Sequence, residues 1–151
     1  MCDMERSEKL TSALKGQLKL IDFGIATAIQ NDTTNIVREN AIGTVNYISP
    51  EALTCSGNAP AKMGRSSDIW SLGCILYQMA YGRPPFSGLN IMQKVRFVPD
   101  PNYAIKYPPL PKFGNASHLI DVLKRCLVRD PKERATIPEL LNHPFLCPSD
   151  T

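Results

Sequence analysis

The sequence predicts a mainly α-helical domain, and three observations support this fold class. Apolar side chains run around much of a helix over residues 69–79, as is typical of a buried helix. Residues 118–128 place apolar side chains at i, i+3, i+4 and i+7, the pattern of an amphipathic helix. Thr136-Ile-Pro-Glu139 is a capping box with proline in the first turn, so a last short helix is expected there. Only residues 17–21 alternate like a short strand, so strand is expected to be scarce.

The segments between these elements are expected to be connections. Residues 27–46 are rich in Asn, Thr and Asp and predict a long surface loop, and residues 54–65 predict a second one. Residues 90–97 predict a short helix. Five prolines in residues 99–111 predict an irregular connection.

The buried helix has signals at both ends. Ser66, Ser67 and Asp68 are residues that cap a helix start, and Gly82 with Pro84 is expected to stop the helix. Its apolar side chains are predicted to form the core of the domain; they are Trp70, Leu72, Ile75, Leu76 and Met79.

Length and composition exclude several classes of protein. The chain has 151 residues and a formal net charge of +3, which suits one domain or half of a larger one. Ile69–Tyr81 is shorter than the roughly 20 apolar residues that span a bilayer, and the polar N-terminus lacks the apolar core of a secretory signal. We therefore expect no membrane crossing and a location inside the cell. The basic residues are scattered, so no nucleic-acid partner is indicated.

Cysteine and histidine do not predict a metal site or a disulfide framework. The five cysteines include no C-x-x-C pair, and His118 and His143 lie at no zinc-type spacing from them. We interpret the cysteines as reduced thiols. Neither histidine has a neighbour that predicts a catalytic role.

The clearest chemical signal follows the predicted strand. Asp22-Phe23-Gly24 places a carboxylate at a strand end beside a glycine, and such a carboxylate is a reasonable ligand for Mg²⁺. The alternative is that Asp22 and Gly24 only make a turn.

Six motifs in a fixed order carry a family resemblance. They are residues 22–24, Gly43-Thr-Val-Asn-Tyr47, Ser49-Pro-Glu51, Asp68-Ile-Trp-Ser-Leu-Gly73, Gly82-Arg-Pro-Pro-Phe86 and Arg129-Asp-Pro-Lys-Glu-Arg134. Together they resemble the second half of a eukaryotic protein kinase domain, its C-terminal helical lobe. Within kinases, three segments together most resemble the dual-specificity kinases of the monopolar-spindle checkpoint family: Asp22-Phe-Gly-Ile-Ala26, Asp32-Thr-Thr34 and residues 43–47.

The resemblance implies a division of the chain. It predicts an unmatched head at 1–14, a partial kinase domain at 15–145 and a tail at 146–151. Within the domain, residues 22–51 would be the activation segment and residues 66–145 the helical lobe, with one short strand before the activation segment.

The resemblance also implies roles for single residues. Asp22 would bind the Mg²⁺ that bridges the ATP phosphates, with Phe23 and Gly24 completing that motif. Gly43-Thr44 would form the ledge on which the protein substrate lies, Thr44 hydrogen-bonding the catalytic base.

Regulatory phosphorylation is expected at three threonines, Thr33, Thr34 and Thr44. For Thr33 and Thr34, composition alone leaves ordinary loop solvation open.

Three further residues would act structurally. Glu51 would pair with Arg134 in a buried ion pair that anchors the activation segment. Asp68 would accept hydrogen bonds from the catalytic loop, or would simply place a negative charge at a helix start.

Several elements of a working kinase do not occur in these 151 residues. There is no G-x-G-x-x-G, no lysine of a V-A-I-K strand before Asp22 and no H-R-D-x-x-x-x-N loop, so the catalytic base is absent. We therefore expect a shortened product, such as an alternative transcript, a partial duplicate or an incomplete gene model. Alone it is expected to be inactive and to lack the means to bind ATP and Mg²⁺ as the family does.

Three interpretations of function follow. The first is a kinase-class transferase that phosphorylates Ser, Thr or Tyr of protein substrates at the mitotic spindle checkpoint. The second is a non-catalytic module that binds protein substrates or a full-length kinase, with a surface near residues 90–97. The third is a product with no stable fold or role. The resemblance implies a cytoplasmic or nuclear location, at the kinetochore or spindle, and leaves the oligomeric state open.

Overall fold

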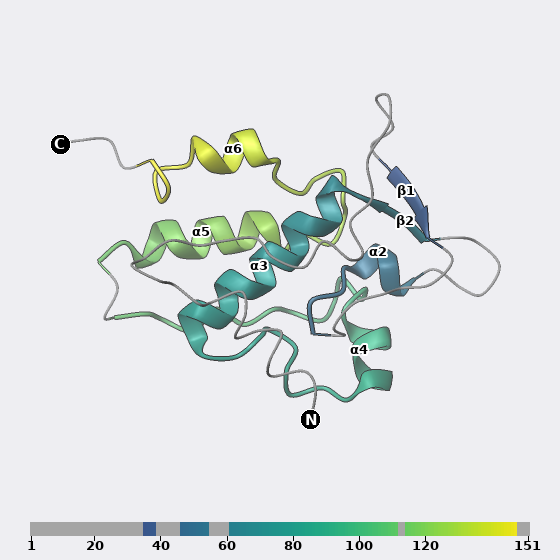
Figure 1. Cartoon of the computed structure of the whole chain (residues 1–151). Helices are drawn as coiled ribbons and strands as arrows, with labels where there is room; N and C mark the ends of the chain where they lie inside the picture. The colour runs from purple at the N-terminus through teal and green to yellow at the C-terminus, as the bar shows by residue number, and fades with distance from the viewer. Residues whose placement is uncertain (1–34, 39–45, 55–60, 112–113, 148–151) are drawn as a thin grey trace, which may run out of the picture. The chain divides into compact units, whose positions relative to one another are not determined.

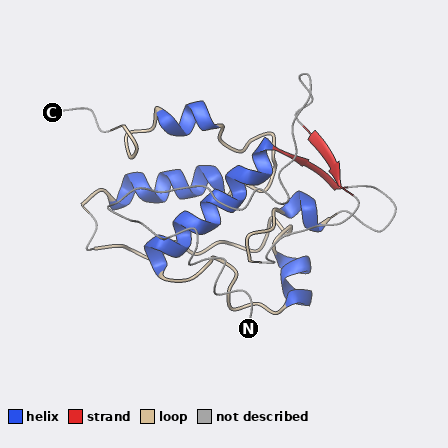
Figure 2. Ribbon diagram, viewed as in Figure 1, coloured by secondary structure: helices blue, strands red, loops and turns tan. Residues whose placement is uncertain are grey.

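The computed structural model describes residues 35–38, 46–54, 61–111 and 114–147, all of which belong to the compact unit Thr33–Thr151. The described part is mainly helical, as the sequence predicts, and Figures 1 and 2 show its helices around α3. The predicted strand at 17–21 and the head at 1–14 lie outside the described residues. No helix within the described ranges combines the length and hydropathy that crossing a bilayer requires.

The longest helix is α3, Arg65–Tyr81. It begins slightly earlier than predicted: Gly64 is the N-cap, so Ser66, Ser67 and Asp68 lie in the first turn. The predicted stop is confirmed. Gly82 has φ 75° and ψ −1°, and its N–H donates to the carbonyl of Gln78 at 2.7 Å, which closes the helix in the left-handed conformation that glycine favours.

The core lies where α3 packs against α5, Ala116–Cys126 (Figure 1). Trp70, Cys74 and Tyr77 of α3 meet Leu119 and Leu123 of α5 in one buried cluster. Phe86, Val98 and Leu127 complete this cluster. The amphipathic pattern predicted α5 because its buried residues repeat every three or four positions.

The two helices approach closely at one glycine. A Cβ atom on Gly73 would lie 2.7 Å from the Cβ of Cys126 and 3.0 Å from Cδ2 of Leu127. These distances are shorter than van der Waals contact, so the crossing requires a residue without a side chain.

Two of the predicted core residues of α3 are exposed. Leu72 is 42% exposed and Met79 is 68% exposed, whereas Trp70 is fully buried and Ile75 and Leu76 are partly buried. The prediction was wrong for Leu72 and Met79 because a helix that is apolar on nearly every side does not reveal which side its neighbours cover. Both side chains lie on the helix away from the buried Trp70, Cys74 and Tyr77.

The connection at 99–111 is irregular, as its prolines predict. Tyrosines of α3 hold it: the Tyr77 hydroxyl donates to the carbonyl of Lys106 at 2.7 Å, and the Tyr81 hydroxyl donates to that of Pro108 at 2.9 Å. These bonds satisfy carbonyls that have no partner in a helix or sheet.

Two short helices begin at capping boxes, and the sequence predicts the one of α6. In α4, Ile91–Phe97, the Asn90 side chain accepts from the N–H of Gln93 at 2.9 Å, and Gln93 accepts from the Asn90 N–H at 3.0 Å. In α6, Ile137–Leu141, Glu139 accepts from the N–H of Thr136 at 2.7 Å. The predicted capping box of α6 is thus confirmed.

Regular structure also occurs inside both predicted loops. Strand β1, Asn35–Arg38, pairs antiparallel with β2, Ala61–Gly64, and Asn35 lies opposite Gly64. A single helical turn, α2, spans Pro50–Leu53. The strands have four residues each, too few for an alternating pattern to stand out, and their ladder depends on a partner distant in the sequence.

Candidate functional site

Only part of the predicted site lies in the described residues. Asp22, Phe23, Gly24 and the threonines at 33, 34 and 44 lie outside them. Glu51, Asp68 and Arg134 are described. The structure brings Glu51 and Arg134 into contact. It places Asp68, which is exposed, in the first turn of α3, where a negative charge is favourable.

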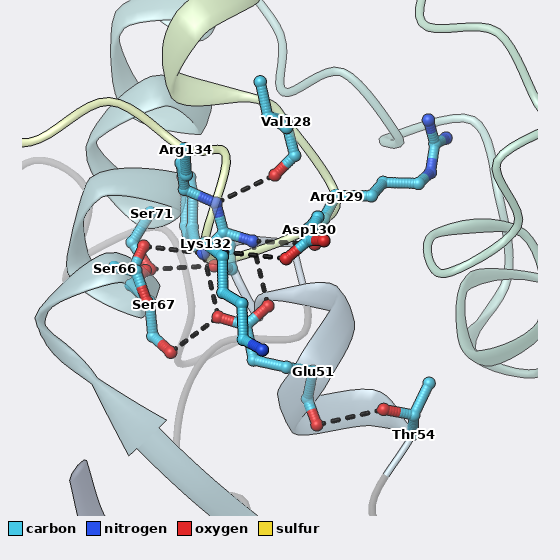
Figure 3. A network of polar contacts seen from close by, with 11 residues as sticks. Glu51, Thr54, Ser66, Ser67, Ser71, Val128, Arg129, Asp130, Lys132 and Arg134 are labelled. Carbon is cyan, nitrogen blue, oxygen red and sulfur yellow. Dashed lines mark hydrogen bonds and ion pairs between the residues drawn. The ribbon is translucent and has the colours of Figure 1, made fainter. Parts of the chain in front are cut away.

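Glu51 and Arg134 form a bidentate ion pair, although 83 residues separate them. The two guanidinium Nη atoms lie 2.8 and 2.9 Å from Oε1 and Oε2 of Glu51 (Figure 3). Glu51 belongs to α2, and Arg134 lies between α5 and α6. The predicted contact is therefore present, with the geometry of the stronger arginine–carboxylate pairs.

The other N–H groups of Arg134 donate to backbone carbonyls. Nε donates to Val128 at 2.8 Å, one Nη to Ser66 at 2.6 Å and the other to Arg129 at 3.1 Å. A guanidinium has five N–H donors, and all five have acceptors here. We call Arg134, Glu51 and these three carbonyls the Arg134 network. The network joins α2, the first turn of α3 and the segment that follows α5.

The Arg134 side chain is completely buried at 0% exposure, and its guanidinium carbon lies 5.3 Å from the centre of the Trp70 ring. A buried arginine is stable only when its charge and donors are compensated, and the network with the aromatic face provides this compensation.

Glu51 remains a carboxylate at neutral pH. Burial alone would raise its pKa, but the hydrogen bond and positive charge of Arg134, with a 2.8 Å bond from the Ser67 hydroxyl, lower the pKa below its ordinary value of 4.5. The negative charge is thus stabilised by the contacts that fix its position.

Acid should weaken the fold through Glu51. Because its pKa is lower in the folded chain than in the unfolded chain, Glu51 contributes stability above pH 4.5, and this contribution is lost as the pH falls through the folded value. Urea unfolding at several pH values should show the difference between the wild type and Glu51→Gln narrowing below about pH 4.5. A difference that stays constant between neutral pH and pH 3 would contradict this account.

Residues 46–49, which precede α2, are held by α3 and α4. The Tyr47 hydroxyl donates to Oε1 of Gln78 at 2.6 Å, and the Ser71 hydroxyl donates to the Tyr47 carbonyl at 2.9 Å. Nζ of Lys94 in α4 donates to Oδ1 of Asn46 at 2.6 Å. We call residues 46–49 the anchored segment. Sequence reasoning missed these contacts because polar residues on a helix do not indicate which loop they meet.

His143 has a structural environment. Its Nε2 lies 2.8 Å from Oδ2 of Asp121 in α5, and its Nδ1 accepts from the N–H of Phe145 at 3.1 Å. The hydrogen bond from His143 and then that from Arg125 lower the pKa of Asp121. The ring thus ties the segment that follows α6 to α5.

Three of the five cysteines lie in the described residues. Cys74, Cys126 and Cys147 are free thiols. Across the residues that the structure describes, no group of three His, Cys, Asp or Glu side chains could hold a metal ion.

Comparison with known proteins relates this chain to protein kinases. The protein kinase domain model matches residues 2–146, so the match includes residues 2–14, where we identified no motif. The chain is 52% identical to the serine/threonine-protein kinase mph1 of Schizosaccharomyces pombe and covers 23% of it. It is 57% identical to the probable serine/threonine-protein kinase mps1 of Dictyostelium discoideum and covers 14% of it. It is 48% identical to the dual specificity protein kinase TTK of Mus musculus and covers 16% of it.

These alignments include 89%, 89% and 87% of the chain, respectively. The chain thus spans less than a quarter of the length of each relative.

Proposed function

Because the chain belongs to the protein kinase domain family, we propose that its residues form the activation segment and substrate-docking part of a protein kinase. The reaction would be ATP-dependent phosphorylation of Ser or Thr, and also of Tyr, on protein substrates. The observation that carries the proposal is the buried Glu51–Arg134 pair. It fixes α2 directly after the anchored segment, where the family resemblance expects the end of the activation segment.

The roles of the remaining predicted residues belong to the same proposal. The family uses ATP and Mg²⁺. Asp22 would bind the Mg²⁺, with Phe23 and Gly24 beside it. Thr33, Thr34 and Thr44 would be phosphorylated, since a phosphate adds nearly two negative charges and can order a loop against basic side chains. Action at the spindle checkpoint, at the spindle or kinetochore, is also proposed.

A phosphate-transfer assay tests whether this chain alone is catalytic. Incubated with Mg-ATP and myelin basic protein, the 151-residue chain is expected to transfer no phosphate above background, because its sequence has no H-R-D-x-x-x-x-N loop to supply a base. Robust transfer that persists after further purification would contradict this expectation.

Docking should be measurable without catalysis. Biolayer interferometry should detect binding of the chain to immobilised myelin basic protein. Thr44→Lys, which places a long cationic side chain on the predicted ledge, should weaken binding by about tenfold, and Lys132→Met should leave it unchanged. Absence of binding by the wild type, or equal binding by Thr44→Lys, would contradict the proposed docking role.

One observation favours the non-catalytic alternative. Helix α4 exposes three large apolar side chains, Ile91, Met92 and Val95. Exposed apolar clusters of this kind occur at protein–protein contacts. If this face binds a full-length kinase, Met92→Gln should abolish binding to purified TTK while leaving binding to myelin basic protein unchanged. If Met92→Gln still binds TTK but binds myelin basic protein more weakly, this alternative is excluded.

A further inference from the structure

The connection between α4 and α5 contains a proline-rich segment that the proposed function does not use. Residues 107–111 read Tyr-Pro-Pro-Leu-Pro, and residues 104–110 form neither helix nor strand. A proline ring fixes φ near −65°, and a residue that precedes a proline is restricted to extended conformations. We call residues 107–111 the proline segment. Its covalent structure thus biases the backbone toward a polyproline II helix.

Burial along the proline segment agrees with this conformation. Tyr107 and Leu110 are partly buried and pack against the core between α3 and α5. Pro108, Pro109 and Pro111 are exposed. A polyproline II helix has three residues per turn, so residues three apart in the sequence lie on the same edge. Tyr107 and Leu110 therefore share an inner edge, and Pro108 and Pro111 share an edge that faces solvent.

The inner edge is held firmly on the lobe. The Tyr81 hydroxyl donates to the Pro108 carbonyl at 2.9 Å, and the ring centres of Tyr77 and Tyr107 are 6.0 Å apart. Nζ of Lys124 lies 5.9 Å from the centre of the Tyr107 ring. Within the part of the chain that the structure describes, the Pro109 carbonyl accepts no hydrogen bond, so a partner's donor would displace none there. The segment is thus ordered from one side and open from the other.

An exposed polyproline II segment is a ligand for a known class of domain. Segments with P-x-x-P spacing, as in Pro108 and Pro111, bind aromatic-lined grooves of WW and SH3 domains. Because this segment is already held extended, binding would cost little conformational entropy. SH3 ligands of the forms R/K-x-x-P-x-x-P and P-x-x-P-x-R/K need a basic residue where this chain has Ile105 or Phe113. The sequence around the prolines therefore favours a WW domain over an SH3 domain.

We propose that the proline segment is a docking site for a WW domain. The aromatic groove of that domain would take the three exposed prolines, while the inner edge of the segment stays on the lobe. The site would bring a second protein to this lobe at a surface separate from the exposed apolar face of α4. The proposal does not depend on the proposed function, because it requires neither a substrate ledge nor catalysis.

Titration of the full chain with purified WW domains tests the proposal. With the set of WW domains of Saccharomyces cerevisiae as the probe, isothermal titration calorimetry should detect binding by at least one member. NMR should then show the largest amide shifts at Lys106, Tyr107 and Leu110, since prolines have no N–H. Absence of binding by every member would overturn the proposal, and so would shifts confined to other parts of the chain. Binding by SH3 domains alone would overturn the assignment to a WW domain.

Proline substitutions test which edge is recognised. The double variant Pro108→Ala with Pro111→Ala should bind at least about tenfold more weakly, with a melting temperature within about 5 °C of the wild type. The matched control is Pro101→Ala, an exposed proline of the same connection outside the proline segment, which should bind like the wild type. Equal binding by the double variant would overturn the proposal. If the double variant unfolds, the single variant Pro111→Ala, which keeps the Tyr81 bond to Pro108, decides by the same comparison.

A free peptide tests whether the fold presents the segment. The full chain should bind the same WW domain at least as tightly as a synthetic peptide of residues 104–111, because the fold already holds the segment extended. Binding by the peptide but not by the chain would show that packing of Tyr107 and Leu110 hides the prolines. That result would overturn the proposal, whatever the outcome of the phosphate-transfer assay.

Discussion

Replacing Arg134 with methionine is expected to lower the free energy of unfolding by about 3 to 5 kcal/mol. The substitution would leave the carboxylate of Glu51 without its cation and would remove the donors to the carbonyls of Ser66, Val128 and Arg129. Unpaired polar groups in a largely buried region are among the few causes of effects this large. Urea unfolding followed by the fluorescence of Trp70, the only tryptophan, measures the change.

Related variants separate charge from geometry. Arg134→Lys keeps the positive charge but has three donors in place of the planar five, so it should recover little of the loss. The double variant Glu51→Leu with Arg134→Met removes both charges and should be more stable than Arg134→Met alone.

Arg125→Met is the control for these variants. It breaks an exposed pair with Asp121 and should change stability by less than about 1 kcal/mol. Wild-type stability in Arg134→Met would show that the network contributes nothing.

Gly73→Ala is expected to destabilise the chain by about 1 to 3 kcal/mol, although alanine is a better helix former than glycine. The added methyl would lie 2.7 Å from the Cβ of Cys126, an atom fixed to the α5 backbone that cannot turn aside. The two helices would have to separate, and contacts across the core would weaken. Thermal and urea unfolding should show the loss, and Gly73→Val should show a larger one.

The control for this substitution is Gly88→Ala. Nothing lies within 4 Å of a Cβ at Gly88, and its φ is not in the left-handed region, so the change should be neutral or slightly stabilising. Equal stability of the variants at 73 and 88 would contradict the close-approach account of the crossing.

Local patterns predicted the helices well where one face is buried and the ends are capped. Helix α5 has a clear apolar face, and α6 begins at a capping box that the sequence spells out in four residues. The stop at Gly82 was likewise predictable, because a glycine after an apolar run favours the left-handed conformation. Each of these features depends on residues within a few positions of one another.

Features that depend on distant partners were not predictable from local patterns. The β1–β2 ladder lies in two segments whose composition indicates loops. The exposure of Leu72 and Met79 depends on which face of α3 its neighbours cover, and the hydrogen bond from Lys94 to Asn46 joins residues 48 positions apart. The Glu51–Arg134 contact was expected only through the family resemblance. The three carbonyls that complete the Arg134 network carry no side-chain signal at all.

The crossing of α3 and α5 also conceals two thiols, Cys74 and Cys126, whereas Cys147 is exposed. Burial raises the pKa of Cys74, and it raises that of Cys126 to about 11, so at neutral pH both remain protonated as well as inaccessible. Alkylating reagents act on the thiolate and should reach these two sulfurs only when the helices part. The rate at which a maleimide modifies Cys74 and Cys126 therefore measures how often the interface between α3 and α5 opens.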